Sequence, residues 1–199
     1  RVSTGNPYQG IITLQQRSLS NPYLKWEETN KFYVGVDLGF FKERLMATFH
    51  YFRNRSSNQL LGYQLPVTTG YGSIIENFPA LVQNSGLEFS INSTNISTKT
   101  LRWVSNLNFT IPKNKLIEFP GLENSTYANT LVIGEPITIV KKLHLIGVDP
   151  TTGIYLFSSK SDPFNPKLPD DANAIINTSP LLYGGLQNNV SYVEFQLDF

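Results

Sequence analysis

The sequence predicts an all-β protein built from antiparallel strands, and three observations carry that prediction. Phe and Tyr, which favour strands, are abundant, with 13 Phe and 10 Tyr among 199 residues,. Residues 32–40 alternate strictly, with apolar side chains at every even position and Tyr, Gly or Asp at every odd one,. Many Asn, Gly and Pro residues separate such stretches, and long helix-favouring runs are absent from the sequence,.

Four strands are predicted in the first half of the chain. The strand at 32–40 is followed by a four-residue connection and a second strand at 45–52, so these two should form an antiparallel hairpin,. A third strand is expected at 86–93 and a fourth at 101–111, where Pro112 should end it,.

The remaining segments alternate less clearly. Residues 54–83 and 161–180 are expected to be mainly loop, and 131–145 is expected to contain a strand interrupted by Pro136,. Residues 149–153, Asp-Pro-Thr-Thr-Gly, predict a turn,. A last strand from about residue 189 should place Val193, Phe195, Leu197 and Phe199 on one face and Tyr192, Glu194, Gln196 and Asp198 on the other,.

Composition excludes several functions. The chain has no Cys, which removes disulfides, zinc–thiolate sites and a cysteine nucleophile, and its formal net charge of +1 gives no basic surface for nucleic acid,. It has two His and no Gly-x-Ser-x-Gly, so a serine hydrolase is not expected,. The adjacent pairs Glu27/Glu28 and Asp170/Asp171 do not form a glycosidase dyad, because neighbours on a strand point to opposite faces,. We therefore expect a protein that is not an enzyme.

Periodicity alone leaves two architectures open. The connections alternate between short and long, and the first strand has Phe32 and Phe40 at the two ends of an apolar face. Transmembrane β-barrels show both features. A soluble β-sandwich, such as a carbohydrate-binding or adhesin-like domain, would show the same alternation facing a core.

A series of short motifs favours the barrel. They are Asn-Pro-Tyr-Leu-Lys-Trp-Glu at 21–27, Gly-Val-Asp-Leu-Gly-Phe-Phe at 35–41, Asn-Ser-Gly-Leu-Glu at 84–88, Gly-Glu-Pro-Ile at 134–137, Gly-Val-Asp-Pro-Thr-Thr-Gly at 147–153 and Tyr-Gly-Gly at 183–185. In this order they resemble the SusC/RagA-type TonB-dependent outer-membrane transporters. The resemblance places the chain in the C-terminal half of a plugged, 22-stranded barrel.

The resemblance implies a location, a function and partners. Residues 1–199 would be part of the barrel domain, with the plug domain and the C-terminal strands outside this stretch. The transporter would lie in the bacterial outer membrane and import bulky nutrients, either glycan oligomers or peptides, with energy supplied through TonB. A SusD-like lipoprotein would form a lid over it, outer-membrane lipid would surround it, and no cofactor is implied.

If the strands form the wall of a barrel, one face of each strand should contact lipid and the other should face the lumen. Lipid should contact Phe32, Val34, Val36, Leu38, Leu87, Phe89, Leu107 and Phe109,. The lumen should receive Tyr33, Asp37, Glu88, Asn92, Arg102, Asn106, Glu194 and Gln196. Loop aromatics are the candidates for stacking on a substrate, namely Tyr63, Tyr71, Tyr127 and Tyr155,.

One departure from the family concerns metal binding. Many relatives follow the Asp-Pro-x-Thr-Gly motif with a segment rich in Asp, Asn and Gly that could bind calcium. Residues 161–166 here are Ser-Asp-Pro-Phe-Asn-Pro and lack the glycine that a tight calcium loop needs,. We expect no metal at this position.

Overall fold

The computed structural model describes residues 2–7, 9–12, 14–16 and 19–199. Five long strands and the short β14 form one antiparallel sheet in the order β14-β13-β8-β7-β4-β3. Their bounds are β3 (Glu28–Phe40), β4 (Leu45–Ser57), β7 (Leu81–Ser97), β8 (Leu101–Glu118), β13 (Tyr183–Tyr192) and β14 (Phe195–Asp198). The predicted all-β class with antiparallel strands is confirmed. Within the described ranges, no helix has the length and apolar character needed to cross a membrane.

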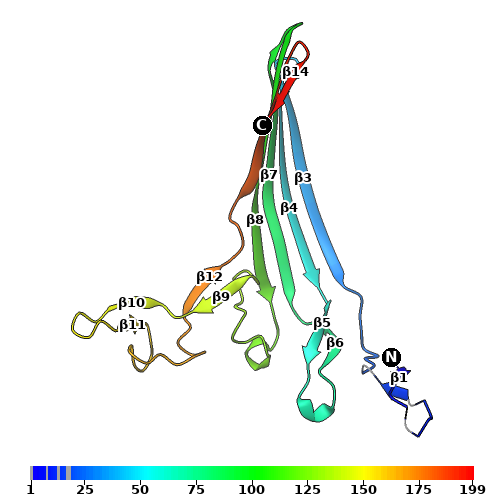
Figure 1. The fold of residues 1–199 in the computed structure, drawn as a ribbon, viewed down its shortest axis with the longest axis vertical. Helices are drawn as coiled ribbons and strands as arrows, with labels where there is room; N and C mark the ends of the chain where they lie inside the picture. The colour runs from blue at the N-terminus through cyan, green and yellow to red at the C-terminus, as the bar shows by residue number, and fades with distance from the viewer. Residues whose placement is uncertain (1, 8, 13, 17–18) are drawn as a thin grey trace.

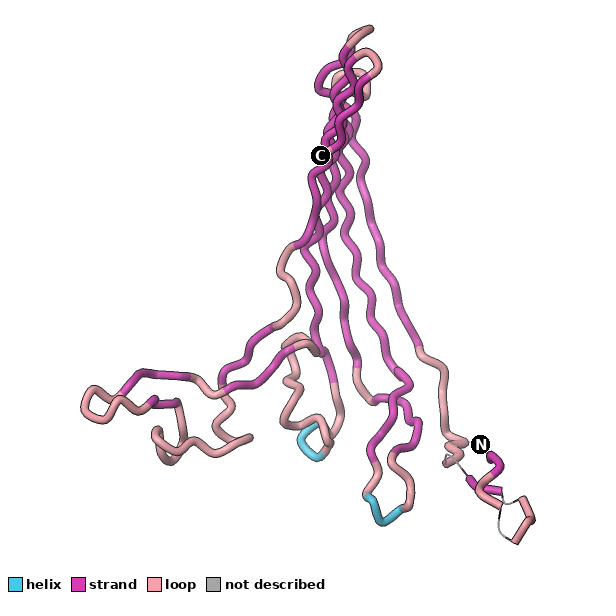
Figure 2. Tube along the Cα trace, in the orientation of Figure 1, coloured by secondary structure: helices cyan, strands magenta, loops and turns pink. Residues whose placement is uncertain are grey.

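The two ends of the sheet differ. Three short connections, at 41–44, 98–100 and 193–194, lie together at the upper end in Figure 1, and the long connections spread out at the lower end. The predicted hairpin at 41–44 is confirmed, and Phe41, Lys42 and Glu43 all adopt left-handed backbone angles there. Figure 2 shows that the long loops and the two short helices belong to the lower end, with only short turns at the upper end; we call the lower end the long-loop end.

Small strand pairs make up much of the long-loop end. They are β1 (Val2–Thr4) with β2 (Leu14–Gln16), β5 (Gln59–Gln64) with β6 (Ser73–Phe78), β9 (Ile139–Lys142) with β12 (Ala174–Asn177), and β10 (Leu145–Val148) with β11 (Tyr155–Phe157). Two 3-10 helices, η1 (Val67–Thr69) and η2 (Leu122–Asn124), complete it. The prediction that 54–83 is mainly loop is wrong, because β4 continues to Ser57 and the β5–β6 hairpin follows.

Three further expectations need correction. Pro112 lies inside β8 instead of ending it. The neighbouring strand β13 pairs with β8 only as far as Thr110, so no hydrogen bond to β13 is lost where Pro112 lacks an N–H,. The strand expected within 131–145 is shorter than predicted, since Ile139–Lys142 forms β9 after Pro136 and Leu145 already belongs to the next strand, β10. The single last strand is in fact two strands, β13 and β14, joined by a tight turn at Val193 and Glu194.

The register gives the sheet two different faces. One face carries rows of apolar side chains, such as the row formed by Val36, Phe49, Phe89 and Phe109. Ring centroids in this row lie 4.5 Å apart for Phe49–Phe89 and 4.9 Å apart for Phe89–Phe109. We call this the apolar face. The opposite face, which we call the polar face, includes the row Asp37, Thr48, Ser90 and Asn108.

The buried core is small and lies at the long-loop end. Its members are Phe78, Ala80, Val82, Leu116, Phe119 and Leu122, with Tyr127 and Leu131 packed against them. Val82 pairs with Leu116 on the polar face, so the loop after β8 folds over that face. Backbone hydrogen bonds hold the returning chain to β8, from Gly134 N–H to Leu116 O (2.8 Å) and from Leu116 N–H to Glu135 O (2.8 Å).

The N-terminal motif at 21–27 docks on the β5–β6 hairpin. The Asn77 side chain accepts a hydrogen bond from Lys25 N–H (2.8 Å) and donates one to Lys25 O (2.9 Å). Asn21 donates to Ile75 O (3.0 Å) and accepts from Tyr23 N–H (3.0 Å). The three bonds to Ile75 and Asn77 tie the segment before β3 to the hairpin.

Candidate functional site

Most of the polar residues expected in the lumen lie on the polar face. Register pairing connects Tyr33, Asp37, Glu88, Asn92, Arg102, Asn106 and Gln196 through rows of that face. Asn92 and Asn106 are direct partners, and Arg102 connects to Gln196 through Ser191. A strip of mainly polar and small side chains, which also includes Phe52 and Met46, therefore runs across all six strands.

Two residues near the C-terminus depart from the expected alternation. Glu194 lies in the β13–β14 turn and so belongs to neither face. Tyr192 pairs with Phe195 and Leu101, which places it on the apolar face instead of beside Gln196. Both differences follow from the turn, because two residues leave the alternation where the chain reverses.

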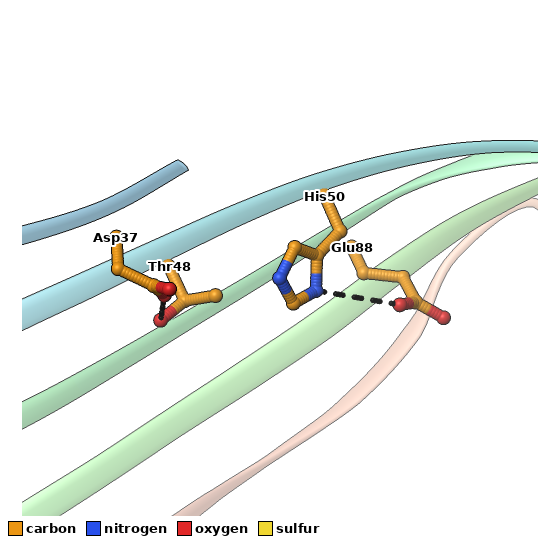
Figure 3. Close-up of polar contacts among 4 residues, drawn as sticks. All are labelled: Asp37, Thr48, His50 and Glu88. Atoms are coloured by element: carbon orange, nitrogen blue, oxygen red, sulfur yellow. Dashed lines mark hydrogen bonds and ion pairs between the residues drawn. The ribbon is translucent and has the colours of Figure 1, made fainter. Parts of the chain in front are cut away.

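Polar contacts link neighbouring strands in the strip, as Figure 3 shows. The Thr48 hydroxyl donates to Asp37 Oδ1 at 2.7 Å, and His50 Nδ1 lies 3.9 Å from Glu88 Oε2. The Tyr33 ring lies 4.9 Å from the imidazole of His50, centroid to centroid. His50 extends over Gly35, where a Cβ atom would lie 2.8 Å from its Nε2. Gly35 therefore makes the space that the imidazole occupies.

His50 is a residue of the strip that sequence reasoning did not assign to it. An isolated histidine on a strand is usually structural, and no neighbouring sequence position marked His50 as special. The signal was the row Gly35–His50–Glu88, which becomes visible only once the register of β3, β4 and β7 is known.

A groove at the long-loop end brings two of the four candidate tyrosines together. It has a volume of about 480 Å³ and lies between the β5–β6 hairpin and the loop at 119–127. Tyr63 stands on the hairpin side and Tyr127 on the loop side, with Glu76 and Asn124 also in the lining. The groove therefore combines aromatic rings with a carboxylate and an amide.

An aromatic cluster fixes the loop side of the groove. Phe78 meets Phe119 edge to face at 4.8 Å and Tyr127 at 5.2 Å, measured between ring centroids. Phe78 and Phe119 are buried, whereas Tyr63 is 38% exposed. Phe78, Phe119, Glu76 and Asn124 were not identified from the sequence, because only the fold brings the two loops together.

The other two candidate tyrosines lie elsewhere. Tyr71 is half-buried in the loop after η1, where its carbonyl accepts a hydrogen bond from Thr69 Oγ1 (3.2 Å). Tyr155 lies on β11, paired with Val148, and is 61% exposed. Neither contributes to the lining of the groove.

Two aspartates organise the long loop between β9 and β12. The Asp171 carboxylate is 3% exposed and accepts hydrogen bonds from Lys160 N–H (3.0 Å), Lys167 N–H (2.7 Å) and Ser159 Oγ (2.8 Å). These bonds, led by the one from the Lys160 N–H, lower the pKa of Asp171,. The side chain of Thr152 and the N–H of Thr151 likewise lower the pKa of Asp149.

The Asp149 bonds belong to the turn that the sequence predicted at 149–153, which is confirmed, with Gly153 N–H bonded to Asp149 O at 2.8 Å. Across the described ranges, no group of three or more His, Asp or Glu side chains is placed to hold a metal ion. Shortly after residues 161–166, where a calcium loop was considered, the Asp171 oxygens are bonded to protein donors. The absence of a metal stays a prediction.

Comparison with known proteins identifies the family. The family model described as "TonB dependent receptor-like, beta-barrel" matches residues 3–195. The chain is 30% identical over 202 residues to TonB-dependent receptor P26 of Formosa agariphila, covering 90% of this chain and 20% of that protein. It is 30% identical over 107 residues to TonB-dependent receptor SusC of Bacteroides thetaiotaomicron, covering 54% of this chain and 11% of that protein.

Solved structures share the fold. The chain superposes on a chain of the RagAB peptide transporter with a TM-score of 0.80 and 23% identity, covering 100% of this chain and 23% of that chain. The open–open state of the RagAB peptide importer gives a TM-score of 0.76. This chain thus spans about a fifth of the length of P26 and of the RagAB chain.

Proposed function

Because the chain belongs to the family of TonB-dependent receptor-like β-barrels, we propose that it forms part of the wall and outer loops of a transporter that imports bulky nutrients with energy supplied through TonB. Proteins of this family are outer-membrane β-barrels, and the six-stranded sheet is wall of such a barrel. The soluble carbohydrate-binding or adhesin-like alternative is therefore wrong. The family consists of transporters, not enzymes.

The observation that carries the proposal is the division of one sheet into an apolar and a polar face, with short turns at one end and long loops at the other. A barrel in a bilayer needs its apolar face toward lipid and its polar face toward the lumen. The short turns then lie on the periplasmic side and the long loops outside the cell.

The substrate is a glycan oligomer or a peptide, and the groove holding Tyr63 and Tyr127 contacts it. Aromatic rings provide flat apolar surface for sugar rings or peptide side chains, while Glu76 and Asn124 supply hydrogen-bond partners,. A SusD-like lipoprotein covers this end of the barrel as a lid. The similarity to SusC and to the RagAB structures supports this assembly.

Uptake by cells that produce the full-length transporter tests the function. Fluorescent oligosaccharides and peptides of graded length are offered with and without a protonophore, and in cells with and without TonB. Accumulation of one class that requires both TonB and the proton gradient is the expected result. Uptake that persists without TonB would refute active import.

The same assay tests the groove. Tyr63→Ala should reduce uptake at low substrate concentration by about fivefold or more, because removing one aromatic contact costs about 1 kcal/mol or more. Tyr155→Ala removes another exposed tyrosine of the long-loop end that lies outside the groove, and it serves as the control. Equal effects of the two substitutions would refute a role for the groove while leaving the transport function intact.

A further inference from the structure

The apolar face carries a cluster of four cations at its long-loop end. The register places Arg53 in the row Phe32–Arg53–Ser85–Lys113 and Arg55 in the row Asn30–Arg55–Gln83–Lys115. These two rows directly follow the apolar row Val34–Tyr51–Leu87–Ile111. We call Arg53, Arg55, Lys113 and Lys115 the basic cluster.

The cluster is compact. Arg53 and Arg55 lie on β4, while Lys113 and Lys115 lie on β8, and the uncharged residues of β7 stand between them. Neighbouring strands are about 4.8 Å apart, so the two pairs are separated by roughly 10 Å. Long cationic side chains across such a gap can reach one anionic group between them.

Protein carboxylates do not neutralise these cations. In the part of the chain that the structure describes, none of the four lies within 4 Å of a carboxylate; the ion pair found there joins His50 and Glu88 on the polar face. Glu135 lines a cavity with Lys113 and Lys115, and Glu28 occupies the row beyond Arg55. Four positive charges thus face two negative ones.

The contacts of the two arginines keep them on the apolar face. The Arg53 guanidinium lies 5.8 Å from the centroid of the Phe32 ring, a cation–π contact at the edge of the apolar rows,. Arg55 Nε donates to Gln83 Oε1 at 2.8 Å. Arg53, Arg55 and Lys113 are all exposed.

The opposite end of the same face is different. Strand positions there hold Leu45, Ser93, Ser105, Trp103 and Leu197, and no Lys or Arg occurs on the apolar face at that end of the six described strands. On the polar face at the level of the cluster, Lys31 stands beside an Asn54–Asn84–Asn114 row. The concentration of charge is therefore specific to one face and one end.

From this placement we propose that the basic cluster binds the phosphates of an acylated lipid in the outer leaflet of the membrane. Exposed cations bordering an apolar band match an amphiphile, whose phosphates meet the cluster while its acyl chains cover Val34, Leu87 and Ile111,. A small free anion such as phosphate would bind to the cations without using the apolar surface beside them, so this surface favours a lipid as the ligand. The proposal rests on the proposed orientation, in which the apolar face meets lipid and the long loops lie outside.

Lipid retention by the purified full-length transporter tests it. The protein in detergent is titrated with bisphosphoryl lipid A, with the dephosphorylated glycolipid or with inorganic phosphate, and bound lipid is counted by native mass spectrometry. We expect retention of the phosphorylated lipid, little of the dephosphorylated one, and no competition from millimolar phosphate. Equal retention of both lipids, or full competition by phosphate, would overturn the proposal.

Substitutions locate the site. Arg53→Gln and Lys113→Gln should each weaken retention roughly fivefold, since one cation near an anionic surface contributes about that factor. The charge-conserving Arg53→Lys should largely keep it, and Lys31→Gln, at the same level on the other face, should not change it. Loss with Lys31→Gln alone would show that the orientation is wrong, and loss with none of the variants would refute the lipid site. Lipid retention is measured without nutrient uptake, so a failure of the lipid proposal can be told apart from a failure of the proposed transport function.

Discussion

Placing a charge in the centre of the apolar face should destabilise the barrel strongly. Phe32 and Phe40 bound the apolar positions of β3, eight residue steps or about 27 Å apart along the strand,. With a strand tilt near 40° this spans roughly 20 Å of membrane depth, close to the height of a barrel's apolar band. Val36 lies midway, so Val36→Arg should cost about 2–4 kcal/mol.

Two substitutions on the polar face serve as controls for the effect of the face. Ser90→Arg lies in the row next to Val36 but on the polar face, and Tyr33→Arg lies on that face of β3 itself. Urea-dependent folding of the full-length transporter into lipid vesicles, followed by the gel shift of the folded barrel, measures the free energy of unfolding. Both controls should cost far less than Val36→Arg; equal costs would refute the assigned register and facing.

Three further predictions concern close packing and loop order. Gly35→Ala should destabilise by about 1–3 kcal/mol, because its Cβ would overlap the imidazole of His50, whereas Gly39→Ala meets no atom closer than 4.0 Å and should be neutral or stabilising in the same unfolding assay,. Phe78→Ala should cost about 3–5 kcal/mol of local stability and expose the loop at 119–131 to protease, and unchanged cleavage would contradict the aromatic cluster,. The bonds to Asp171 lower its pKa in the folded loop, so their stabilisation is complete above its ordinary value near 3.8 and is lost as pH falls through the lowered value,. The protection factors for amide exchange at 159–171, which are corrected for the intrinsic pH dependence, should therefore fall in acid, and Asp171→Asn should lower them at neutral pH too; protection factors that are the same at pH 3 and pH 7 would contradict this.

Local alternation was enough to predict β3, β4, β7 and β8. Residues 32–40 alternate without exception, and a four-residue connection to the next alternating stretch leaves only an antiparallel hairpin, which the structure has,. Even there the strands are longer than predicted. Their outer parts, such as Glu28–Lys31 and Arg53–Ser57, carry polar side chains on both faces, so no alternation marks them.

Features that depend on distant partners were missed. Pro112 normally ends a strand, yet it is tolerated because β13 stops at Thr110, a fact that local sequence does not contain. Val193 adopts a left-handed angle (φ 53°), which is rare for a β-branched residue, so neither composition nor alternation signals the turn there,.

The candidate site shows the same limit. Alternation separates the polar from the apolar side within each strand, and the register confirms that Asp37, Glu88 and Asn106 share one face; their exposure to the lumen stays a prediction. The groove could not be predicted, since Tyr63 and Tyr127 are distant in sequence and meet only through the packing of Phe78 on Phe119. Nor could the basic cluster, which requires the register between β4, β7 and β8.

The contact between the apolar face and lipid is the central claim, and spin labels along β3 test it most directly. Single cysteines at positions 33–38 of the full-length transporter, made free of other cysteines and placed in lipid vesicles, carry the label. Relaxation by oxygen, which concentrates in lipid, is compared with relaxation by a water-soluble nickel complex. The account predicts that labels at 34, 36 and 38 respond to oxygen more strongly than those at 33, 35 and 37. The reverse alternation, or none at all, would contradict it.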